Sequence, residues 1–106
     1  MAHAPEQAKM TRFETREPRG RLVVLDLRAR THLQRRRPAA LGYLDAVIAT
    51  VSSPDMHEDD PISGRERFYR RDLTGSRWLR VVVDFTESPA FVVTAFVQDN
   101  QPEAEA

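Results

Sequence analysis

The amino-acid sequence predicts an α+β fold in which an N-terminal strand and two helices pack on an antiparallel β-meander sheet. Three observations support this fold class. A β-rich run occupies residues 22–27, an apolar stripe with helical spacing lies between residues 41 and 51, and three β-rich segments separated by turn residues fill 65–97. At 106 residues, the chain has the length of one domain.

The N-terminal part is expected to be a flexible tail followed by the first strand. Residues 1–18 mix alanine, proline and charged residues without a period, as flexible tails do. Arg19 and Gly20 form a turn, and residues 22–27 predict a short strand. At the other end, residues 100–106 are expected to be a second flexible tail, so the single domain spans 19–99.

Two helices are expected next. Thr31 is a suitable N-cap for a short helix that ends at Arg36, because the residue before Pro38 avoids helical geometry. The second helix carries one apolar stripe and ends at Ser53-Pro54. The stripe consists of Leu41, Leu44, Val47, Ile48 and Val51. An acidic connector over residues 55–64 follows, with one short extended piece around Met56 and His57.

The last third of the chain predicts a three-stranded meander. Its strands are expected at 65–73, 78–85 and 90–97, with turns at 74–76 and 87–89. Because side chains alternate across a sheet, residue parity separates its two faces. The helix-facing side is expected to hold Phe68, then Leu79, Val81, Val83 and Phe85, then Phe91, Val93, Ala95 and Val97.

The opposite, open face is expected to carry the residues with chemistry. They are Arg67, Tyr69, Arg71, Arg80 and Thr94, with Trp78, Val92 and Phe96 beside them. Arginines next to aromatic planes suit single-stranded RNA, because bases stack on the rings and phosphates meet the guanidinium charge. The alternative is a solvated face whose arginines pair with Asp72 and Asp84.

Charge is balanced overall but uneven along the chain. Sixteen bases and sixteen acids give a net charge of zero, while residues 1–37 carry +6, 38–64 carry −5, 65–85 carry +3 and 86–106 carry −4. A local basic patch, rather than the overall charge, would therefore attract phosphate. Fifteen of the bases are arginine, which suits bidentate phosphate contacts. A codon bias from GC-rich coding would produce the same preference.

Several classes of protein are disfavoured by what the sequence lacks. There is no cysteine, which excludes disulfides, thiolate metal sites and cysteine nucleophiles. The first residues contain no apolar run of signal-peptide length, and no stretch reaches 18 apolar residues, so we expect a cytoplasmic protein without a membrane partner. There is no glycine-rich phosphate loop, HExxH motif or nucleophile elbow, and no cofactor is expected.

His32 is the histidine best placed for proton chemistry. Its imidazole could shuttle a proton while a 2′-hydroxyl attacks the adjacent phosphodiester, and arginines would stabilise the charge on the pentavalent phosphate. His57 lies in the acidic connector, where a solvated role is expected. A divalent-metal site at His57, Glu58, Asp59 and Asp60 is disfavoured, because such local runs are usually exposed loops. We therefore expect no metal.

From Thr31 onward, the chain resembles the compact microbial RNase-toxin fold that unites barnase, EndoU, colicin-type and RelE nucleases (the BECR fold), and especially its phage-associated branch. The resemblance covers about 70 residues, roughly Leu22 to Val97. The fragments that carry it are His32-Leu33, Arg36-Arg37-Pro38, Ser53-Pro54-Asp55, Arg65-x-x-x-Tyr69, Trp78-Leu-x-Val-Val-Val and Val93-Thr94-Ala95-Phe96.

The resemblance implies metal-independent RNA cleavage by an RNase-toxin-like domain. His32 would act as acid or base, Tyr69 would orient or stack, and Thr94 would make a polar contact from the last strand. The catalytic set is then His32, Arg67, Tyr69 and Thr94, and the set that binds RNA or phosphate is Arg36, Arg37, Arg65, Arg71, Arg80 and Trp78. Relatives often have Arg-His-Pro where this chain has Arg36-Arg37-Pro38, so a second proton carrier is missing.

The function expected from the sequence is that of a small cytoplasmic RNase-like protein that cleaves or binds single-stranded RNA. It would be the toxin of a toxin–antitoxin or phage-derived system, with RNA and an antitoxin protein as partners. The alternative is a non-catalytic module that holds RNA or a protein on the same sheet face. In a third interpretation, the chain never meets RNA and buries Trp78 and Phe96 in a homodimer.

Overall fold

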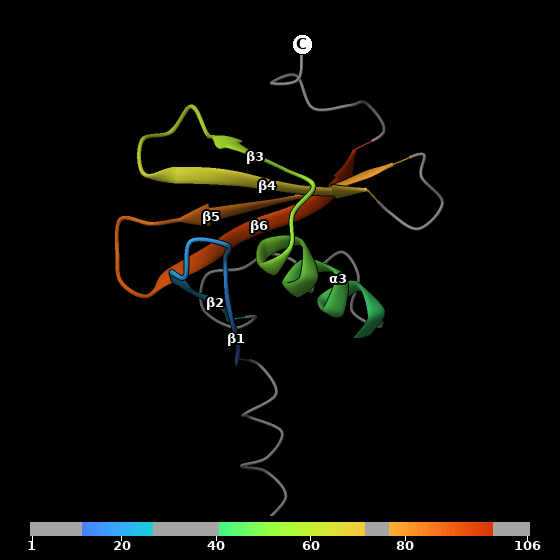
Figure 1. Cartoon of the computed structure of the whole chain (residues 1–106), viewed down its shortest axis with the longest axis horizontal. Helices are drawn as coiled ribbons and strands as arrows, with labels where there is room; N and C mark the ends of the chain where they lie inside the picture. Colours follow the sequence, from blue (N-terminus) through green and yellow to red (C-terminus); the bar gives the residue numbers. More distant parts are fainter. Residues whose placement is uncertain (1–11, 27–40, 72–76, 99–106) are drawn as a thin grey trace, which may run out of the picture.

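The computed structural model describes residues 12–26, 41–71 and 77–98 (Figure 1). In chain order the elements are β1 (Arg12–Arg16), β2 (Leu22–Asp26), α3 (Leu41–Ser52), β3 (Met56–Asp59), β4 (Arg65–Arg71), β5 (Trp78–Asp84) and β6 (Ala90–Gln98). The strands form one six-stranded sheet in the order β1-β2-β6-β5-β4-β3.

The fold class expected from the sequence is wrong. The part of the chain that the structure describes is mostly β, with one helix and a mixed sheet, instead of two helices on an antiparallel meander. The meander itself is present, since β4, β5 and β6 pair antiparallel. However, β2 joins β6 in parallel, and β1 and β3 add an antiparallel strand at each edge. The short helix expected at 31–36 lies outside the described residues.

Strand β1 lies in the segment that was expected to be a tail. It pairs with β2 from Arg12 opposite Asp26 to Arg16 opposite Leu22. Its side chains alternate, with Phe13 and Thr15 partly buried and the charged residues between them exposed. Charged side chains are common on edge strands because they discourage pairing with another chain. Composition alone hides such a strand, because three of its five residues are charged.

Strand β3 lies in the segment that was expected to be an acidic connector. Only an extended piece around Met56 and His57 was anticipated, but four residues pair with β4, from Met56 opposite Tyr69 to Asp59 opposite Glu66. The strand is too short and too polar to be recognised from β propensity. Its pairing places two acidic residues, Glu58 and Asp59, beside β4.

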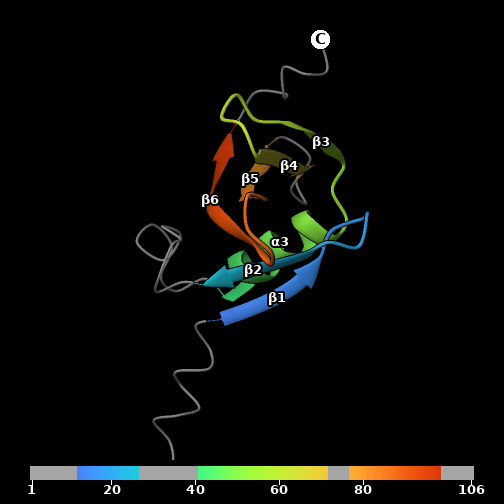
Figure 2. The same cartoon turned by 90° about the vertical axis from the view of Figure 1, so that its left-hand side faces the viewer.

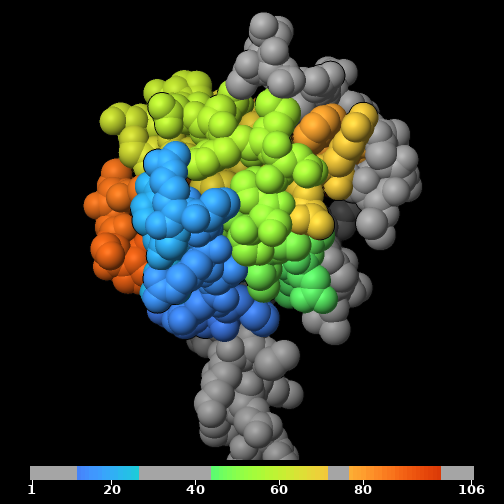
Figure 3. Space-filling view, in the orientation of Figure 1, coloured from blue at the N-terminus to red at the C-terminus, as the bar shows by residue number. Residues whose placement is uncertain are grey.

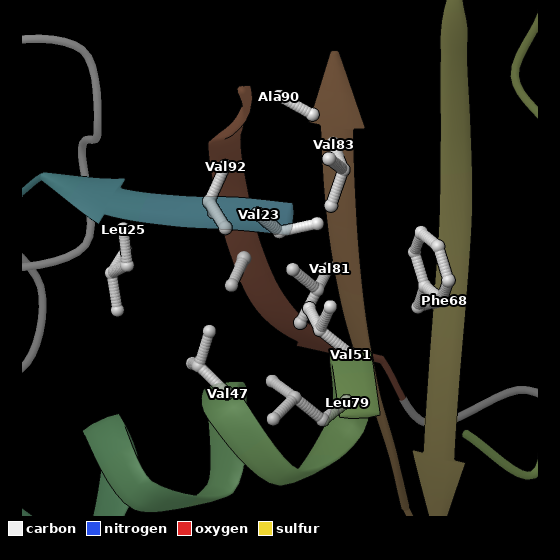
Figure 4. Packing of buried hydrophobic residues seen from close by; sticks show 11 residues of the cluster. Val23, Leu25, Val47, Val51, Phe68, Leu79, Val81, Val83, Ala90 and Val92 are labelled. Atoms are coloured by element: carbon white, nitrogen blue, oxygen red, sulfur yellow. The ribbon is translucent and has the colours of Figure 1, made fainter. Parts of the chain in front are cut away.

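The second helix is confirmed as α3. Val47 and Val51 are fully buried, and Leu44 and Ile48 pack against the core as the apolar stripe predicts. The helix ends at Ser52, just before Ser53-Pro54. It lies on one face of the sheet, against β1, β4 and β5. Figure 4 shows the core between them, which consists of Val23, Leu25, Val47, Val51, Phe68, Leu79, Val81, Val83, Ala90, Val92 and Ala95.

A β-bulge in β6 changes the parity expected for the last strand. Val82 lies opposite Thr94, but Val83 lies opposite Val92, so Val93 is an extra residue. The core residues of β6 are therefore Ala90 and Val92 before the bulge, and Ala95 and Val97 after it. The expectation is correct for Ala95, Val97, Thr94 and Phe96, and wrong for Phe91, Val92 and Val93. Figure 2 shows β6 starting beside β2 and curving away from it.

The helix has 12 residues, and none of the described helical structure is long and apolar enough to cross a membrane.

Candidate functional site

The face of the sheet that points away from α3 is called the outer face here. Strand pairing arranges its side chains in rows across the sheet, each two residues from the next along the strands, and three consecutive rows carry most of the residues assigned from the sequence. The first row is Glu58, Arg67, Val82 and Thr94; the second is Met56, Tyr69, Arg80 and Phe96; the third is Arg71, Trp78 and Gln98. Four of the residues expected on an open face, Arg67, Tyr69, Arg71 and Arg80, therefore do lie together.

The first two rows meet in a cluster of two carboxylates, a phenol and a guanidinium group. The hydroxyl of Tyr69 donates to Glu58 Oε2 over 2.5 Å. Arg67 donates from Nε to Asp60 Oδ1 over 2.7 Å, and its NH1 lies 3.4 Å from Glu58 Oε2. The backbone N–H of Ile62 donates to the second oxygen of Asp60 over 2.9 Å, which holds that carboxylate in place.

These contacts change the protonation equilibria of the cluster. Burial raises the pKa of Tyr69, and the hydrogen bond to Glu58 raises it further, so the phenol stays protonated. Burial opposes ionisation of Asp60, but hydrogen bonds from Ile62 and Arg67 outweigh it and lower the pKa of this carboxyl. The hydrogen bond to Asp60 raises the pKa of Arg67. Asp60 is therefore a fixed anion, while the phenol of Tyr69 remains a donor to Glu58.

Arg80 is held between two aromatic rings. Its guanidinium carbon lies 5.4 Å from the centre of the Tyr69 ring and 5.1 Å from that of Phe96. Both distances are within the range of cation–π attraction. Its Nε is buried and, among the residues that the structure describes, has no hydrogen-bond partner. A donor on a charged group left in this state costs stability, because water no longer solvates it and no acceptor replaces the water.

Two further arginines complete the face. The guanidinium carbon of Arg71 lies 5.3 Å from the centre of the Trp78 ring. Arg65 Nε lies 3.4 Å from Asp84 Oδ2, and the backbone N–H of Thr86 donates to Asp84 Oδ1 over 2.8 Å. Hydrogen bonds from Thr86 lower the pKa of Asp84, so this carboxylate is an anion that partly neutralises Arg65.

The outer face is less open than expected. Tyr69 is fully buried and Val82 is 7% exposed, whereas Phe96 is 36% exposed. The ring of Tyr69 is therefore inaccessible to a nucleobase, and what this residue can contribute is the orientation of Glu58. The alternative of a solvated face with paired arginines is correct in part, because Arg65 pairs with Asp84. Asp72, its other suggested partner, lies outside the described residues.

Three of the residues assigned from the sequence cannot be placed relative to this face. His32, Arg36 and Arg37 lie outside the described residues, so their convergence with Arg67 and Thr94 stays a prediction. Conversely, sequence reasoning assigned no catalytic role to Glu58 and no role beyond metal binding to Asp60. No signal within residues 56–60 would have found them, because Glu58 and Asp60 come close to Arg67 only through the pairing of residues 56–59 with 66–69.

A second polar cluster lies on the side of the sheet that faces α3. Arg21 bonds Glu66 through both terminal nitrogens, at 2.8 and 3.1 Å, and also donates to Glu17 from Nε over 3.0 Å. His57 Nε2 lies 2.6 Å from Glu66 Oε1, and its ring stacks on Phe68 with centroids 4.3 Å apart. Figure 3 shows the N-terminal hairpin (blue) lying against the β3 region (green) on this side of the molecule.

The charges of this second cluster are fixed by its ion pairs. Burial opposes ionisation of Glu17, which is only 2% exposed, yet hydrogen bonds from Arg21 lower its pKa to about 2. Burial likewise opposes ionisation of Glu66, but Arg21 and His57 lower the pKa of this carboxyl. His57 was expected to be a solvated loop residue. It is instead a partly buried strand residue, with its side chain 22% exposed.

The metal interpretation gains no support from this arrangement. Residues His57 and Glu58 are adjacent on β3, so their side chains point to opposite faces, His57 toward Phe68 and Glu58 toward Tyr69. Among the residues that the structure describes, no group of three or more histidine, cysteine or acidic side chains is positioned to hold a metal ion.

Comparison with known proteins gives no relative from which to transfer a function. No family model, curated protein or solved structure matches this chain.

Proposed function

We propose that this chain is a small cytoplasmic RNase-like protein that cleaves single-stranded RNA on the outer face without a metal ion. The observation that carries the proposal is the placement of Glu58. Its carboxylate accepts the Tyr69 hydroxyl, lies 3.4 Å from Arg67 and shares a row with Thr94. A carboxylate oriented beside guanidinium groups has the composition of a general base next to an anion-stabilising group.

In the proposed reaction, the 2′-oxygen of a ribose attacks the adjacent phosphorus. Glu58 accepts the proton of the 2′-hydroxyl, and Tyr69 holds the carboxylate by its hydrogen bond. The bond from phosphorus to the 5′-oxygen breaks, which gives a 2′,3′-cyclic phosphate and a free 5′-hydroxyl. The leaving oxygen takes its proton from an acid, the role that the sequence assigns to His32.

The arginines would stabilise the additional negative charge of the pentavalent phosphate. Arg67 is fixed by Asp60, so its guanidinium group is oriented before RNA binds. Arg80 brings a donor, Nε, that no acceptor in the described part of the chain satisfies. Thr94 lies in the same row as Arg67 and would supply a hydroxyl to a phosphate or ribose oxygen.

Binding without cleavage is the second candidate function. It is favoured by the partial neutralisation of Arg67, which two carboxylates contact, and by Arg37 at the position where relatives often carry histidine. In that case, the same face would hold RNA through Arg80, Arg71 and the rings of Phe96 and Trp78. A toxin role with an antitoxin partner follows only from the resemblance, and growth arrest on expression is its test.

Substitution of Glu58 tests the proposal. E58Q keeps the size and the hydrogen-bond acceptor of the side chain but removes its basicity, so we expect the rate of RNA cleavage to fall by about 100- to 10,000-fold. The matched control is E14Q, the same substitution on the exposed edge strand, which should leave the rate unchanged.

The pattern of outcomes separates the candidates. Cleavage by E58Q at the wild-type rate would exclude Glu58 from the mechanism. If H32A loses cleavage while E58Q keeps it, the imidazole of His32 carries the proton transfer. If the unmodified protein binds RNA in a salt-dependent manner and produces no new fragments, the second candidate function, binding without cleavage, is favoured.

A further inference from the structure

We propose that the outer face holds RNA in a fixed register, with one nucleotide on each of the three rows defined above and a footprint of three nucleotides. The phosphate to be cleaved would lie on the row of Glu58, Arg67 and Thr94. The next nucleotide would lie on the row of Arg80 and Phe96, and the third on the row of Arg71 and Trp78. This inference rests on the proposed function and adds the direction and length of the bound strand.

The spacing of the rows supports this register. Successive rows are two residues apart on β4 and β5, from Arg67 to Tyr69 to Arg71 and from Val82 to Arg80 to Trp78. Two residues of a strand span about 7 Å. This distance is comparable to the separation of successive nucleotides in an extended single strand, so an RNA lying along β5 meets one row per nucleotide.

The second row offers both parts of a nucleotide subsite. Arg80 has an unpartnered Nε, and a phosphate oxygen is the kind of acceptor that would satisfy it. Because Nε is buried, the guanidinium group must shift before an anion can reach it. Phe96 is the exposed side of this stack, with 36% of its surface accessible, and its free face can take a base.

The third row repeats the arrangement with Arg71 over the partly buried Trp78. Charge distinguishes these two rows from the first. In the first row, Glu58 and Asp60 contact Arg67, whereas in the described part of the chain the guanidinium groups of Arg71 and Arg80 contact rings and no carboxylate. The positive charge that phosphates can meet therefore lies on the second and third rows. This favours binding of RNA on those two rows and cleavage on the first row.

Stacking on Phe96 and Trp78 requires unpaired bases, because bases in a duplex already stack on one another. The register therefore predicts selection against double-stranded RNA.

The fluorescence of Trp78, which is the single tryptophan of the chain, reports on the third row. Titration of E58Q, which should bind without cleaving, with oligouridylates of two, three, four and six nucleotides is expected to show an affinity that rises steeply up to three nucleotides and little beyond. F96A and R80K should each weaken binding of the trinucleotide by about tenfold. R12K, which keeps the charge of an exposed residue on the edge strand β1, should bind normally.

The outcomes distinguish the register from the proposed function. If RNA binds but affinity grows evenly with length, or F96A and R80K bind like R12K, the register is wrong while the proposed function stands. If no RNA binds at all, both fail. The register would also be overturned if an RNA duplex quenched the Trp78 fluorescence as strongly as single-stranded RNA of the same length. Equal quenching by polyglutamate of that length would overturn it too, in favour of a protein partner. Should F96A fail to fold, the length series with E58Q still decides.

Discussion

Arg67 and Arg80 show how neighbours divide the roles of similar residues on one face. Both project from the outer face on adjacent rows, yet Arg67 is fixed by Asp60 and Glu58, whereas Arg80 contacts only aromatic rings in the described part of the chain. An arginine fixed by carboxylates is already oriented for a transition state, and one that lacks an acceptor can rearrange around an anion. Residue type alone does not distinguish these two roles.

Residue parity predicted that Arg67 and Arg80 lie on the same face of the sheet. It could not predict that carboxylates fix Arg67, whereas Arg80 contacts aromatic rings. Alternation from Phe68 was sufficient to place Arg67, Tyr69, Arg71 and Arg80 on one face. The acids that neutralise part of that face come from β3 and from the turn after it, where strand pairing brings them together. Such pairing joins residues that are about ten positions apart, and no periodicity within either segment reveals it.

At the residue scale, the ionisation of Glu17 makes the stability of the fold depend on pH. Its folded pKa of about 2 lies below the ordinary value of 4.5, so it stabilises the fold above pH 4.5, and this contribution is lost as the pH falls from 4.5 toward 2. We expect the free energy of unfolding, measured by urea titration, to decrease over this interval by at most about 3 kcal/mol from this group.

The variant E17Q isolates this contribution. It should be less stable than the unmodified protein at pH 7, and the difference should become small near pH 2, where the folded-state carboxyl is about half protonated and the unfolded-state carboxyl is fully protonated. E14Q, the same substitution on exposed β1, is the control and should have the stability of the unmodified protein at pH 7. Parallel curves for E17Q and the unmodified protein between pH 5 and 2 would contradict the assignment.

At the element scale, the turn into β4 depends on Gly64. Its φ is +89°, and a Cβ atom there would lie 2.4 Å from Thr86 Cγ2. The carbonyl of Gly64 also accepts the N–H of Phe85 over 2.8 Å, so the turn cannot move away from β5 without losing that bond. Thr86 is itself held by its hydrogen bonds to Asp84.

We therefore expect G64A to destabilise the fold more than G20A. Gly20 has a similar φ of +91° but nothing within 4 Å of a Cβ, so G20A reports the backbone strain alone, about 1–2 kcal/mol. The contact with Thr86 should add roughly 1–3 kcal/mol for G64A. The measurement is the free energy of unfolding of both variants at pH 7.

A double variant checks the stated cause. T86S removes Cγ2 but keeps the hydroxyl that bonds Asp84, so G64A/T86S should recover most of the additional loss relative to T86S alone. Equal losses for G64A in the presence and absence of the methyl group would assign the effect to the backbone.

The strands also show which elements a sequence predicts well. The helix α3, β2 and the meander have strong apolar periods, and the sequence predicted all of them. The strands β1 and β3 were missed because each is short and polar and gains its stability from pairing with a neighbour. The bulge at Val93 was missed for another reason, since one extra residue inverts parity without changing composition.

At the scale of the whole molecule, Arg21 joins two parts of the sheet that are distant in sequence. It bonds Glu17 beside β1, bonds Glu66 on β4 and lies 3.7 Å from the centre of the Phe85 ring. The N-terminal hairpin also contacts the rest of the fold through the pairing of β2 with β6 and the packing of β1 against α3. The guanidinium group thus ties the hairpin to the strands that form the outer face.

Replacement of Arg21 by lysine should loosen the hairpin. Lysine keeps the charge but cannot bond two carboxylates with a planar fork. In hydrogen exchange at neutral pH, we expect the amides of β1 and β2 to exchange about tenfold faster, which corresponds to about 1.4 kcal/mol of local stability, with little change in β5. R12K, on the exposed edge, is the control. Uniform acceleration across all strands would show that Arg21 stabilises the fold globally instead.

The measurement that tests the central claim most directly is the analysis of RNA ends after incubation of the purified protein with single-stranded RNA in excess EDTA. The account predicts fragments that carry 2′,3′-cyclic phosphates and 5′-hydroxyls, detected by mass spectrometry, and their disappearance with E58Q. Intact RNA, fragments that appear only when a divalent ion is restored, or fragments that persist unchanged with E58Q would contradict it.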